Sequence, residues 1–284
     1  ALAQLPFELL PLGGRRVVEA AEMHYAQSLS VYALSRARQD EYRGLVRPKD
    51  LLAVGNPEYE AKAAPAADMR TRGAAATRVL VEEQLKDMRH AWPPLPGSER
   101  EIAAIRRLLP NSDVLLQRDA SEEALQRANA SGSLTTYRYL HFAVHGNLSM
   151  TDPALSSLVL SQVNLNPDTD GHITAAEWPG YNLRSDLTVL SACETGLGKS
   201  LSGEGVMGLP FALFAAGNVN TLLSLWPVFD DVTPKLMEKF FARLIAGHSA
   251  ASALSATKRE MAADPNPRIR HPSSWAGFVL VGAG

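Results

Sequence analysis

Two residues have the types and positions that nucleophilic chemistry requires. Cys193 is the only cysteine of the chain and follows the apolar run Leu187–Leu190, at the start of a Gly-rich loop. His145 ends a second apolar run, which begins at Tyr139, and Gly146 comes directly after it. A thiol needs a base or an imidazolium neighbour to become a useful thiolate near neutral pH. The pair therefore predicts nucleophilic catalysis by Cys193, with His145 as its base.

Both apolar runs have the length and composition of buried strands. In open α/β sheets, ligands and reacting groups gather at the carboxyl ends of the strands. If the two strands are parallel neighbours, His145 and Cys193 meet at one edge of the sheet. The N–H groups of Gly146 and Cys193 would then form an oxyanion hole for a substrate carbonyl.

Apolar runs alternate with helical patterns along the rest of the chain. Helices are expected near residues 98–109, 121–130, 206–216, 231–246 and 249–262, and a short helix capped by Ser28 precedes them. Strands are expected near residues 51–54, 114–116, 139–144, 157–161, 187–190, 219–226 and 275–281. This alternation predicts an α/β fold with a central, mostly parallel β-sheet flanked by helices on both faces. Capping boxes are expected at residues 98–101 and 174–177.

Composition and charge argue against several classes of function. The net charge of -2 leaves no broad basic field, so no nucleic-acid partner is expected. A single cysteine excludes an internal disulfide framework and suits a reducing compartment, so we expect a cytoplasmic protein. No apolar run reaches the length of a membrane span and no signal peptide is seen, so no membrane association is expected.

Two segments resemble nucleotide-binding loops. Residues 193–200 match a P-loop except at the first position, where Cys193 replaces glycine and its Cβ hinders a tight turn around phosphate. Gly203, Gly205 and Gly208 have the dinucleotide-binding spacing, but they begin about ten residues after their strand instead of directly after it. A P-loop-like nucleotide-binding protein therefore remains an alternative.

Two further patterns have structural explanations. Residues 166–177 follow the spacing of an EF-hand calcium loop, with Asn166 in place of the first Asp. The segment before them reads as a strand, whereas an EF-hand loop lies between helices, so we predict a turn and no metal site. His141 lies four residues before His145 on the same strand and deeper in the sheet, so we predict a core or hydrogen-bonded histidine.

Several motifs together resemble one family. The sequences HFAVHG, LSACETGLGK, GEGV, SLWP and HPSSWAGFVLVG look like those of the CHAT peptidases, which are caspase-like cysteine proteases of clan CD related to separase. The histidine precedes the cysteine by about 50 residues, as in caspases. The resemblance implies a caspase-like fold and a cysteine endopeptidase in which His145 and Cys193 form the catalytic dyad. It implies no metal and no organic cofactor.

The same resemblance implies how the chain is organised. Residues 1–95 match more loosely and would be the N-terminal part of the CHAT region, truncated at its start, while residues 96–284 would be the catalytic domain. CHAT proteins usually carry tetratricopeptide repeats, so a repeat domain acting as sensor and a protein or peptide substrate are expected. The activity implied is regulated proteolysis in a bacterial signalling or defence system. A catalytically inactive caspase-like interaction module is the other alternative.

Substrate-binding residues are expected after the strand that follows Cys193. Ser224 and Trp226 lie where caspase-like proteins bind an extended peptide, with Trp226 walling a subsite, although a core position suits this tryptophan equally. Asp230 and Asp231 are expected to cap the next helix. The acidic candidates for the pocket that receives the residue before the scissile bond are Asp152, Glu194, Glu204, Asp230 and Asp231. A carboxylate in that pocket would favour Arg or Lys.

Overall fold

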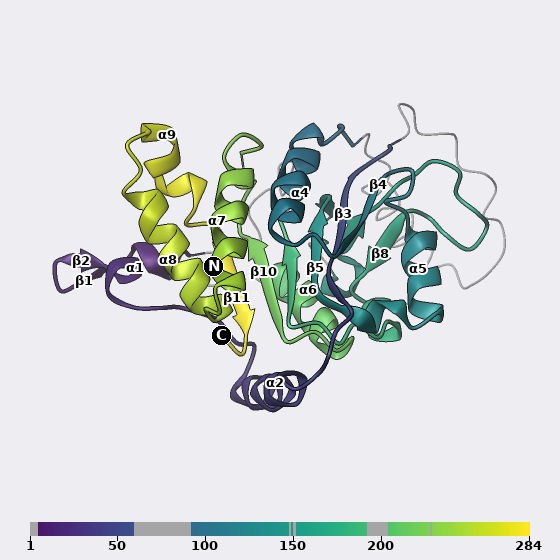
Figure 1. Cartoon of the computed structure of the whole chain (residues 1–284), viewed down its shortest axis with the longest axis horizontal. Helices are drawn as coiled ribbons and strands as arrows, with labels where there is room; N and C mark the ends of the chain where they lie inside the picture. The colour runs from purple at the N-terminus through teal and green to yellow at the C-terminus, as the bar shows by residue number, and fades with distance from the viewer. Residues whose placement is uncertain (1–4, 60–91, 148, 150–151, 192–203, 228) are drawn as a thin grey trace.

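The computed structural model describes residues 5–59, 92–147, 149, 152–191, 204–227 and 229–284. Within these ranges a six-stranded sheet has the order β11-β10-β9-β5-β3-β4 (Figure 1). Its strands are β3 (Lys49–Pro57), β4 (Ser112–Gln117), β5 (Tyr137–Ala143), β9 (Leu187–Leu190), β10 (Asn220–Ser224) and β11 (Phe278–Gly282). Neighbours are parallel, except that β10 and β11 are antiparallel. The predicted mostly parallel sheet is confirmed.

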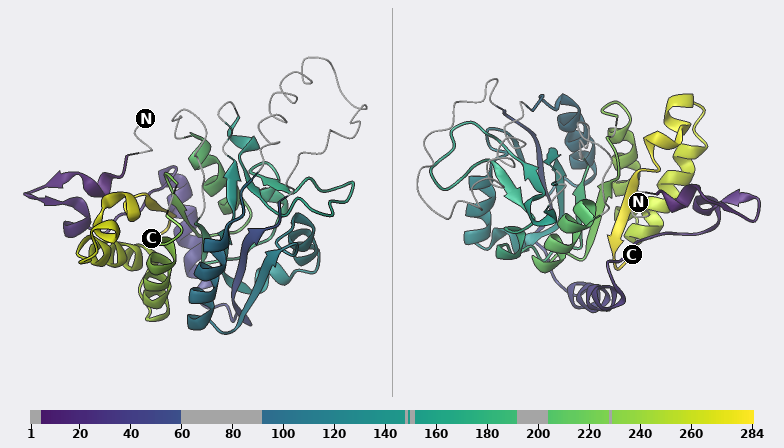
Figure 2. Two further views of the ribbon diagram at one scale, coloured as in Figure 1. Left: turned by 90° about the horizontal axis from the view of Figure 1, so that it is seen from above. Right: turned by 180° about the vertical axis from the view of Figure 1, so that it is seen from behind.

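Helices cover both faces of this sheet (Figures 1 and 2). One face packs against α4 (Pro96–Leu108), α7 (Thr233–Ile245) and α8 (Ala250–Ala262), and the other against α5 (Glu122–Ala130) and α6 (Glu204–Ala215). Successive side chains of a strand point to opposite faces. Leu51 and Ala53 therefore join one hydrophobic core, while Leu52 and Val54 join the other. Both faces of the sheet are buried, as continuous apolar strands require.

The first part of the chain supplies an inner strand. β3 pairs with β4 on one side and with β5 on the other. Before it lie η2 (Phe7–Leu9), β1 (Pro11–Leu12), β2 (Arg15–Arg16), α1 (Val17–Ala20) and α2 (Leu29–Tyr42). The Ser28 hydroxyl caps α2 by accepting the Val31 N–H at 3.1 Å, as predicted. The Glu8 carboxylate lies 2.6 Å from the Lys258 ammonium in a buried ion pair, which ties η2 to α8.

A second, antiparallel sheet contains β6 (His145–Asn147), β7 (Ser157–Val159) and β8 (His172–Thr174). β5 ends at Ala143, and the chain bends at Val144 before β6 begins. The expected single strand that ends in His145 is therefore divided between two sheets. The short elements η3 (Ser133–Thr136), η4 (Pro153–Leu155), η5 (Trp178–Gly180), α9 (Pro267–Arg270) and η6 (Pro272–Ser274) complete the described structure.

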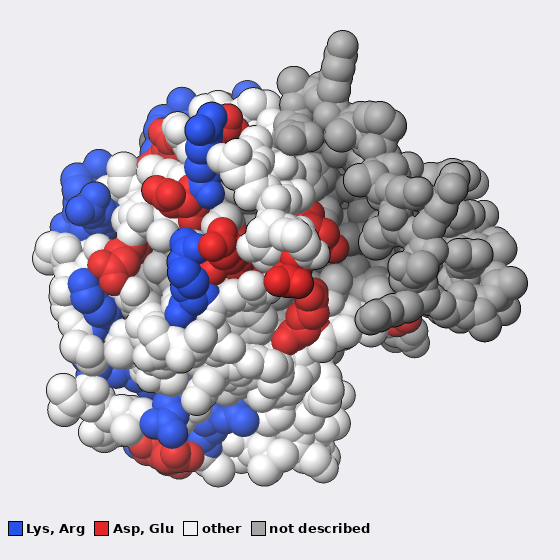
Figure 3. Space-filling view, turned by 90° about the vertical axis from the view of Figure 1, so that its right-hand side faces the viewer, with Lys and Arg blue, Asp and Glu red and all other residues white. Residues whose placement is uncertain are grey.

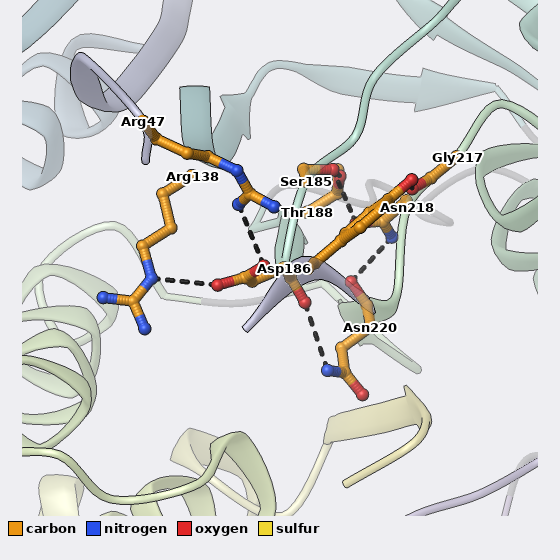
Figure 4. A network of polar contacts seen from close by, with 9 residues as sticks. Arg47, Arg138, Ser185, Asp186, Thr188, Gly217, Asn218 and Asn220 are labelled. Carbon is orange, nitrogen blue, oxygen red and sulfur yellow. Dashed lines mark hydrogen bonds and ion pairs between the residues drawn. The ribbon is translucent and has the colours of Figure 1, made fainter. Parts of the chain in front are cut away.

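Polar side chains hold the amino ends of β9 and β10 (Figure 4). The carboxylate of Asp186 accepts hydrogen bonds from Arg47 and Arg138, both at 2.9 Å. The side-chain oxygen of Asn218 accepts the hydroxyl of Ser185 at 2.8 Å. Because these contacts link Arg47 and Arg138 to Asp186 and Ser185 to Asn218, the network fixes the strands at the edge opposite their carboxyl ends.

The surface on the side of α5 mixes both signs of charge (Figure 3). Arg118 pairs with Glu58 at 2.7 Å, and Arg127 pairs with Glu123 at 2.5 Å one turn away on α5. Exposed pairs of this kind contribute little to stability. Among the described residues, no helix combines the length and apolar character needed to cross a membrane.

Candidate active site

His145 lies just beyond the carboxyl end of β5 and has no exposed surface. Its Nε2 atom is 2.8 Å from the carbonyl oxygen of Pro93. Because a carbonyl oxygen can only accept, this contact requires a proton on Nε2. The centroid of the imidazole is 5.0 Å from the ring of Trp92 and 5.3 Å from that of Tyr59. Two aromatic rings and one carbonyl therefore fix the orientation of this histidine.

The strand that leads to Cys193 lies beside the strand that leads to His145. β9 and β5 are adjacent and parallel, and the N–H of Ser191 donates to the carbonyl of Phe142 at 3.1 Å. The predicted adjacency of the two strands is thus confirmed. Cys193 and Glu194 fall outside the described residues, as do residues 192–203 as a whole. The dyad, the N–H of Cys193 and the P-loop-like segment therefore remain predictions.

Gly146, the other expected oxyanion donor, is buried in β6. It lies opposite Leu158 of β7, and His145 lies opposite Val159. Pairing with β7 turns the chain away from the large sheet directly after β5. This brings the His-Gly pair to the carboxyl edge of the sheet, where the end of β9 also lies.

His141 is a core histidine, as predicted. It is fully buried in β5, and its Nε2 atom lies 2.8 Å from Oε1 of Glu101 on α4. The capping box expected at residues 98–101 is wrong, because proline at the first helical position starts the helix at residue 96. Glu101 consequently lies on the buried side of the helix, and the Ser98 hydroxyl donates to the Leu95 carbonyl at 2.8 Å.

Ser224 and Trp226 lie at the carboxyl end of β10, next to the end of β9. The buried Ser224 hydroxyl donates to the Trp226 carbonyl at 2.6 Å. The Trp226 indole donates to the carbonyl of Ser273 at 2.9 Å, and a Cβ added at Gly277 would lie 2.5 Å from its ring. β10 lies between β9 and β11, so residues 220–223 have strand neighbours on both sides. An added peptide strand could pair only beyond this stretch.

The two aspartates after β10 have separate partners. Asp231 accepts a hydrogen bond from Arg268 at 3.0 Å. Asp230 packs on the first turn of α4, where a Cβ added at Gly97 would lie 2.7 Å from its carboxyl carbon. Neither caps α7, whose N-cap is Val232 with no side-chain hydrogen bond, so the expected caps are wrong. The reason is that the Asp231 carboxylate is paired with Arg268 on α9, while the Asp230 side chain lies against the first turn of α4.

Asp152 has a local structural role. Its carboxylate accepts the N–H of Ala154 at 3.0 Å and caps η4. η4 in turn packs against α6, where a Cβ added at Gly208 would lie 2.9 Å from the Pro153 carbonyl oxygen. The last glycine of the dinucleotide-like spacing is therefore explained by close packing between a turn and a helix.

In the calcium-like loop, residues 166–177, acidic and amide side chains accept hydrogen bonds from nearby backbone N–H groups. The side chains of Asn166 and Asp170 each accept an N–H two residues ahead, at 2.8 and 2.9 Å. Glu177 accepts both the N–H and the hydroxyl of Thr174 at 2.7 Å. The N–H groups of Asp170 and Gly171 donate to the buried Glu122, and burial raises the pKa of this carboxyl to about 7. Within the described residues, no cluster of three or more His, Cys, Asp or Glu could hold a metal ion.

We expect calcium to leave the thermal unfolding of this protein unchanged. Three of the side chains that an EF-hand would direct at the ion, Asn166, Asp170 and Glu177, accept hydrogen bonds from N–H and hydroxyl groups. A strand precedes the loop where an EF-hand has a helix. Isothermal titration with calcium is the direct measurement, with Glu177→Gln as the control variant. A micromolar dissociation constant that is lost in Glu177→Gln would contradict this expectation.

Comparison with known proteins identifies the family. The CHAT domain model matches residues 1–283. Tetratricopeptide repeat protein 28 is 27% identical over 225 residues in Homo sapiens and 26% over 235 in Mus musculus. Each match covers 69% of this chain but only 9% of the relative.

A solved structure shows the same fold. The Saccharomyces cerevisiae separase-securin complex matches 98% of this chain and 15% of the separase-securin chain, with a TM-score of 0.52 and 14% identity. The strand order and the helices on both faces agree with a caspase-like architecture. This chain therefore belongs to the CHAT domain family and has the caspase-like α/β fold.

Proposed function

We propose that this chain is a cysteine endopeptidase in which Cys193 attacks the peptide carbonyl and His145 is the base. The observation that carries the proposal is the position of His145, buried beside the end of the strand that leads to Cys193 and oriented by the Pro93 carbonyl. Membership of the CHAT family and the fold shared with separase support it.

The Pro93 carbonyl selects the nitrogen that acts as base. With the proton held on Nε2, Nδ1 of His145 is the nitrogen that takes the thiol proton. The thiolate sulfur forms a bond to the carbonyl carbon, and the imidazolium then gives its proton to the amine as the carbon–nitrogen bond breaks. Water hydrolyses the resulting thioester with His145 again as base. The N–H groups of Gly146 and Cys193 are proposed to stabilise the oxyanion.

We also propose that a repeat domain controls this activity. The curated relatives are named for tetratricopeptide repeats, and this chain spans only 9% of their length. The family resemblance adds regulated proteolysis of a protein substrate in a bacterial signalling or defence system. A separate regulatory segment is consistent with a catalytic histidine that has no exposed surface.

Digestion of a peptide library by the wild-type chain and by Cys193→Ala tests the proposed function. Cleavage by the wild type alone is the expected result. A wild-type chain that neither cleaves peptides nor reacts with a thiol-directed peptide probe would favour the inactive interaction module. A thermal shift with nucleotide would instead favour the phosphate-binding alternative.

We expect the enzyme to prefer a basic residue immediately before the scissile bond. Asp231 is already paired with Arg268, whereas Asp230 lies against the turn of α4 that follows the Pro93 segment. Asp230→Ala should lower kcat/KM for an Arg peptide by about 10- to 100-fold and spare a Leu peptide, because the ion pair with the Asp230 carboxylate forms only with Arg.

A fluorogenic series that differs only at this position measures the preference. Asp231→Ala is the matched control and should retain the preference for Arg. Faster hydrolysis of the Asp or Leu peptide than of the Arg and Lys peptides by the wild type would exclude a basic specificity.

A further inference from the structure

Asn56 occupies an unusual position at the same edge of the sheet as His145. It follows Gly55, which pairs with Ala143 at the end of β5, and the pairing between β3 and β4 shifts register between Gly55 and Pro57. The φ angle of Asn56 is 41°, in the left-handed region. Asparagine enters this region more readily than most residues other than glycine.

Both ends of the Asn56 amide are engaged with the chain that enters α4. The side-chain oxygen accepts the N–H of Leu95 at 2.8 Å. The side-chain nitrogen donates to Oε1 of Glu99, in the first turn of α4, at 2.7 Å. The left-handed turn directs the side chain toward Leu95, which lies 39 positions later in the sequence. One side chain thus fixes both the start of α4 and the residue that precedes it.

This anchor lies two residues from the carbonyl that orients His145. Between Pro93 and Leu95 stands Pro94, whose ring fixes one backbone angle and restricts the conformation of the residue before it. The direction of the Pro93 carbonyl therefore depends closely on where Leu95 is held. A displacement of Leu95 would move the acceptor away from Nε2 of His145.

We propose that Asn56 is a positioning residue for the catalytic base. It holds Leu95, the proline pair transmits that position, and the Pro93 carbonyl keeps the proton of His145 on Nε2. The role deepens the proposed peptidase function and rests on it, because the tautomer matters only if Nδ1 receives the thiol proton. Asn56 itself touches neither the imidazole nor the substrate in this scheme.

The first test compares two left-handed asparagines. Asn56→Ala should lower kcat/KM by about 10- to 100-fold, as expected when a catalytic group is displaced by about 1 Å. Asn164 also has a positive φ, 59°, and is exposed, so Asn164→Ala carries the same backbone cost without the contact to Leu95. Equal activity of the two variants would overturn the positioning role.

The second test exchanges donor and acceptor between Asn56 and Glu99. Asn56→Asp keeps an acceptor for the Leu95 N–H but places a second carboxylate against that of Glu99. Because the two negative charges repel each other, the activity of this variant should also fall. Glu99→Gln alone keeps an acceptor for Asn56 and should be nearly neutral. The double variant restores a donor facing Asp, and we expect its kcat/KM to recover about tenfold over Asn56→Asp. No recovery in the double variant would contradict the anchor.

A readout independent of cleavage separates this inference from the proposed function. Nitrogen NMR of labelled histidines in the Cys193→Ala background reports the tautomer of His145. The signals of His145 are identified because they disappear when His145→Ala is added. We expect the Nε2–H form in the parent, a mixture with Asn56→Ala, and the Nε2–H form again in the donor–acceptor exchange. An unchanged tautomer in Asn56→Ala overturns the role of Asn56. Absence of Cys193-dependent cleavage by the wild type instead overturns the peptidase function.

Discussion

Replacing Cys193 with alanine is expected to abolish peptide cleavage while leaving the domain folded. Removing the nucleophile of a catalytic unit costs about 10⁴- to 10⁶-fold in kcat. The hydrophobic cores on the two faces of the sheet are built from other residues, including Leu187, Val189 and Leu190 of the strand before the thiol. The free energy of unfolding should therefore change by about 1 kcal/mol or less. Hydrolysis of a fluorogenic peptide and thermal unfolding measure the two quantities.

A neighbouring serine provides the matched control. Ser191 lies two residues before Cys193, is buried, and follows the same strand. Ser191→Ala also removes one small polar group from this strand end but leaves the thiol in place. If the reaction requires the thiol itself, this variant should cleave peptide within a few-fold of the wild type. Full activity of Cys193→Ala would eliminate the proposed nucleophile. Loss of folding in Cys193→Ala alone would make the cysteine a structural residue.

The sheet could be predicted because its signals are local. The run Leu187–Leu190 is bounded and apolar, and β9 has the same limits. The helices after Ser121 and Ser249 begin where a serine can cap them, and both hydroxyls accept the expected N–H. Alternation of such elements limits the fold to a parallel sheet with helices on both faces. The antiparallel edge strand β11 does not alter that pattern, because its residues are equally apolar.

The division between β5 and β6 could not be read from the sequence. Residues 139–144 form one continuous apolar run, and nothing in it marks the bend at Val144. The bend arises because His145 pairs with Val159, a residue of another sheet. Pairing with a residue distant in sequence thus decides where the strand ends, and the local pattern of apolar residues cannot predict such a pairing.

The surroundings of His145 were missed for a similar reason. Pro93 lies 52 residues before the histidine, in a proline-rich stretch with no periodic pattern. Asn56 and Pro57 give a clear turn signal, but the partners of the asparagine side chain lie in another element. Sequence reasoning can recognise such a turn, whereas the use of its side chain depends on how α4 packs beside β3.

Replacing His145 with alanine should inactivate the enzyme about as fully as replacing Cys193. The structure gives His145 an orienting carbonyl and a place beside the strand that leads to the thiol. Because base and nucleophile act as a unit, the double variant His145→Ala with Cys193→Ala should lose little more activity than either single variant. Single-turnover hydrolysis of the same fluorogenic peptide gives this comparison.

His141→Ala is the matched control and should show the opposite behaviour. Its loss leaves Glu101 buried without the partner now 2.8 Å away, so the free energy of unfolding should fall by about 3 kcal/mol. The molecules that remain folded should still cleave peptide, since His141 faces α4 and not the strand end. Adding Glu101→Ala should recover part of the lost stability by removing the unpaired carboxylate. Near-native turnover of His145→Ala, or a stable but inactive His141→Ala, would show that His145 is not the base.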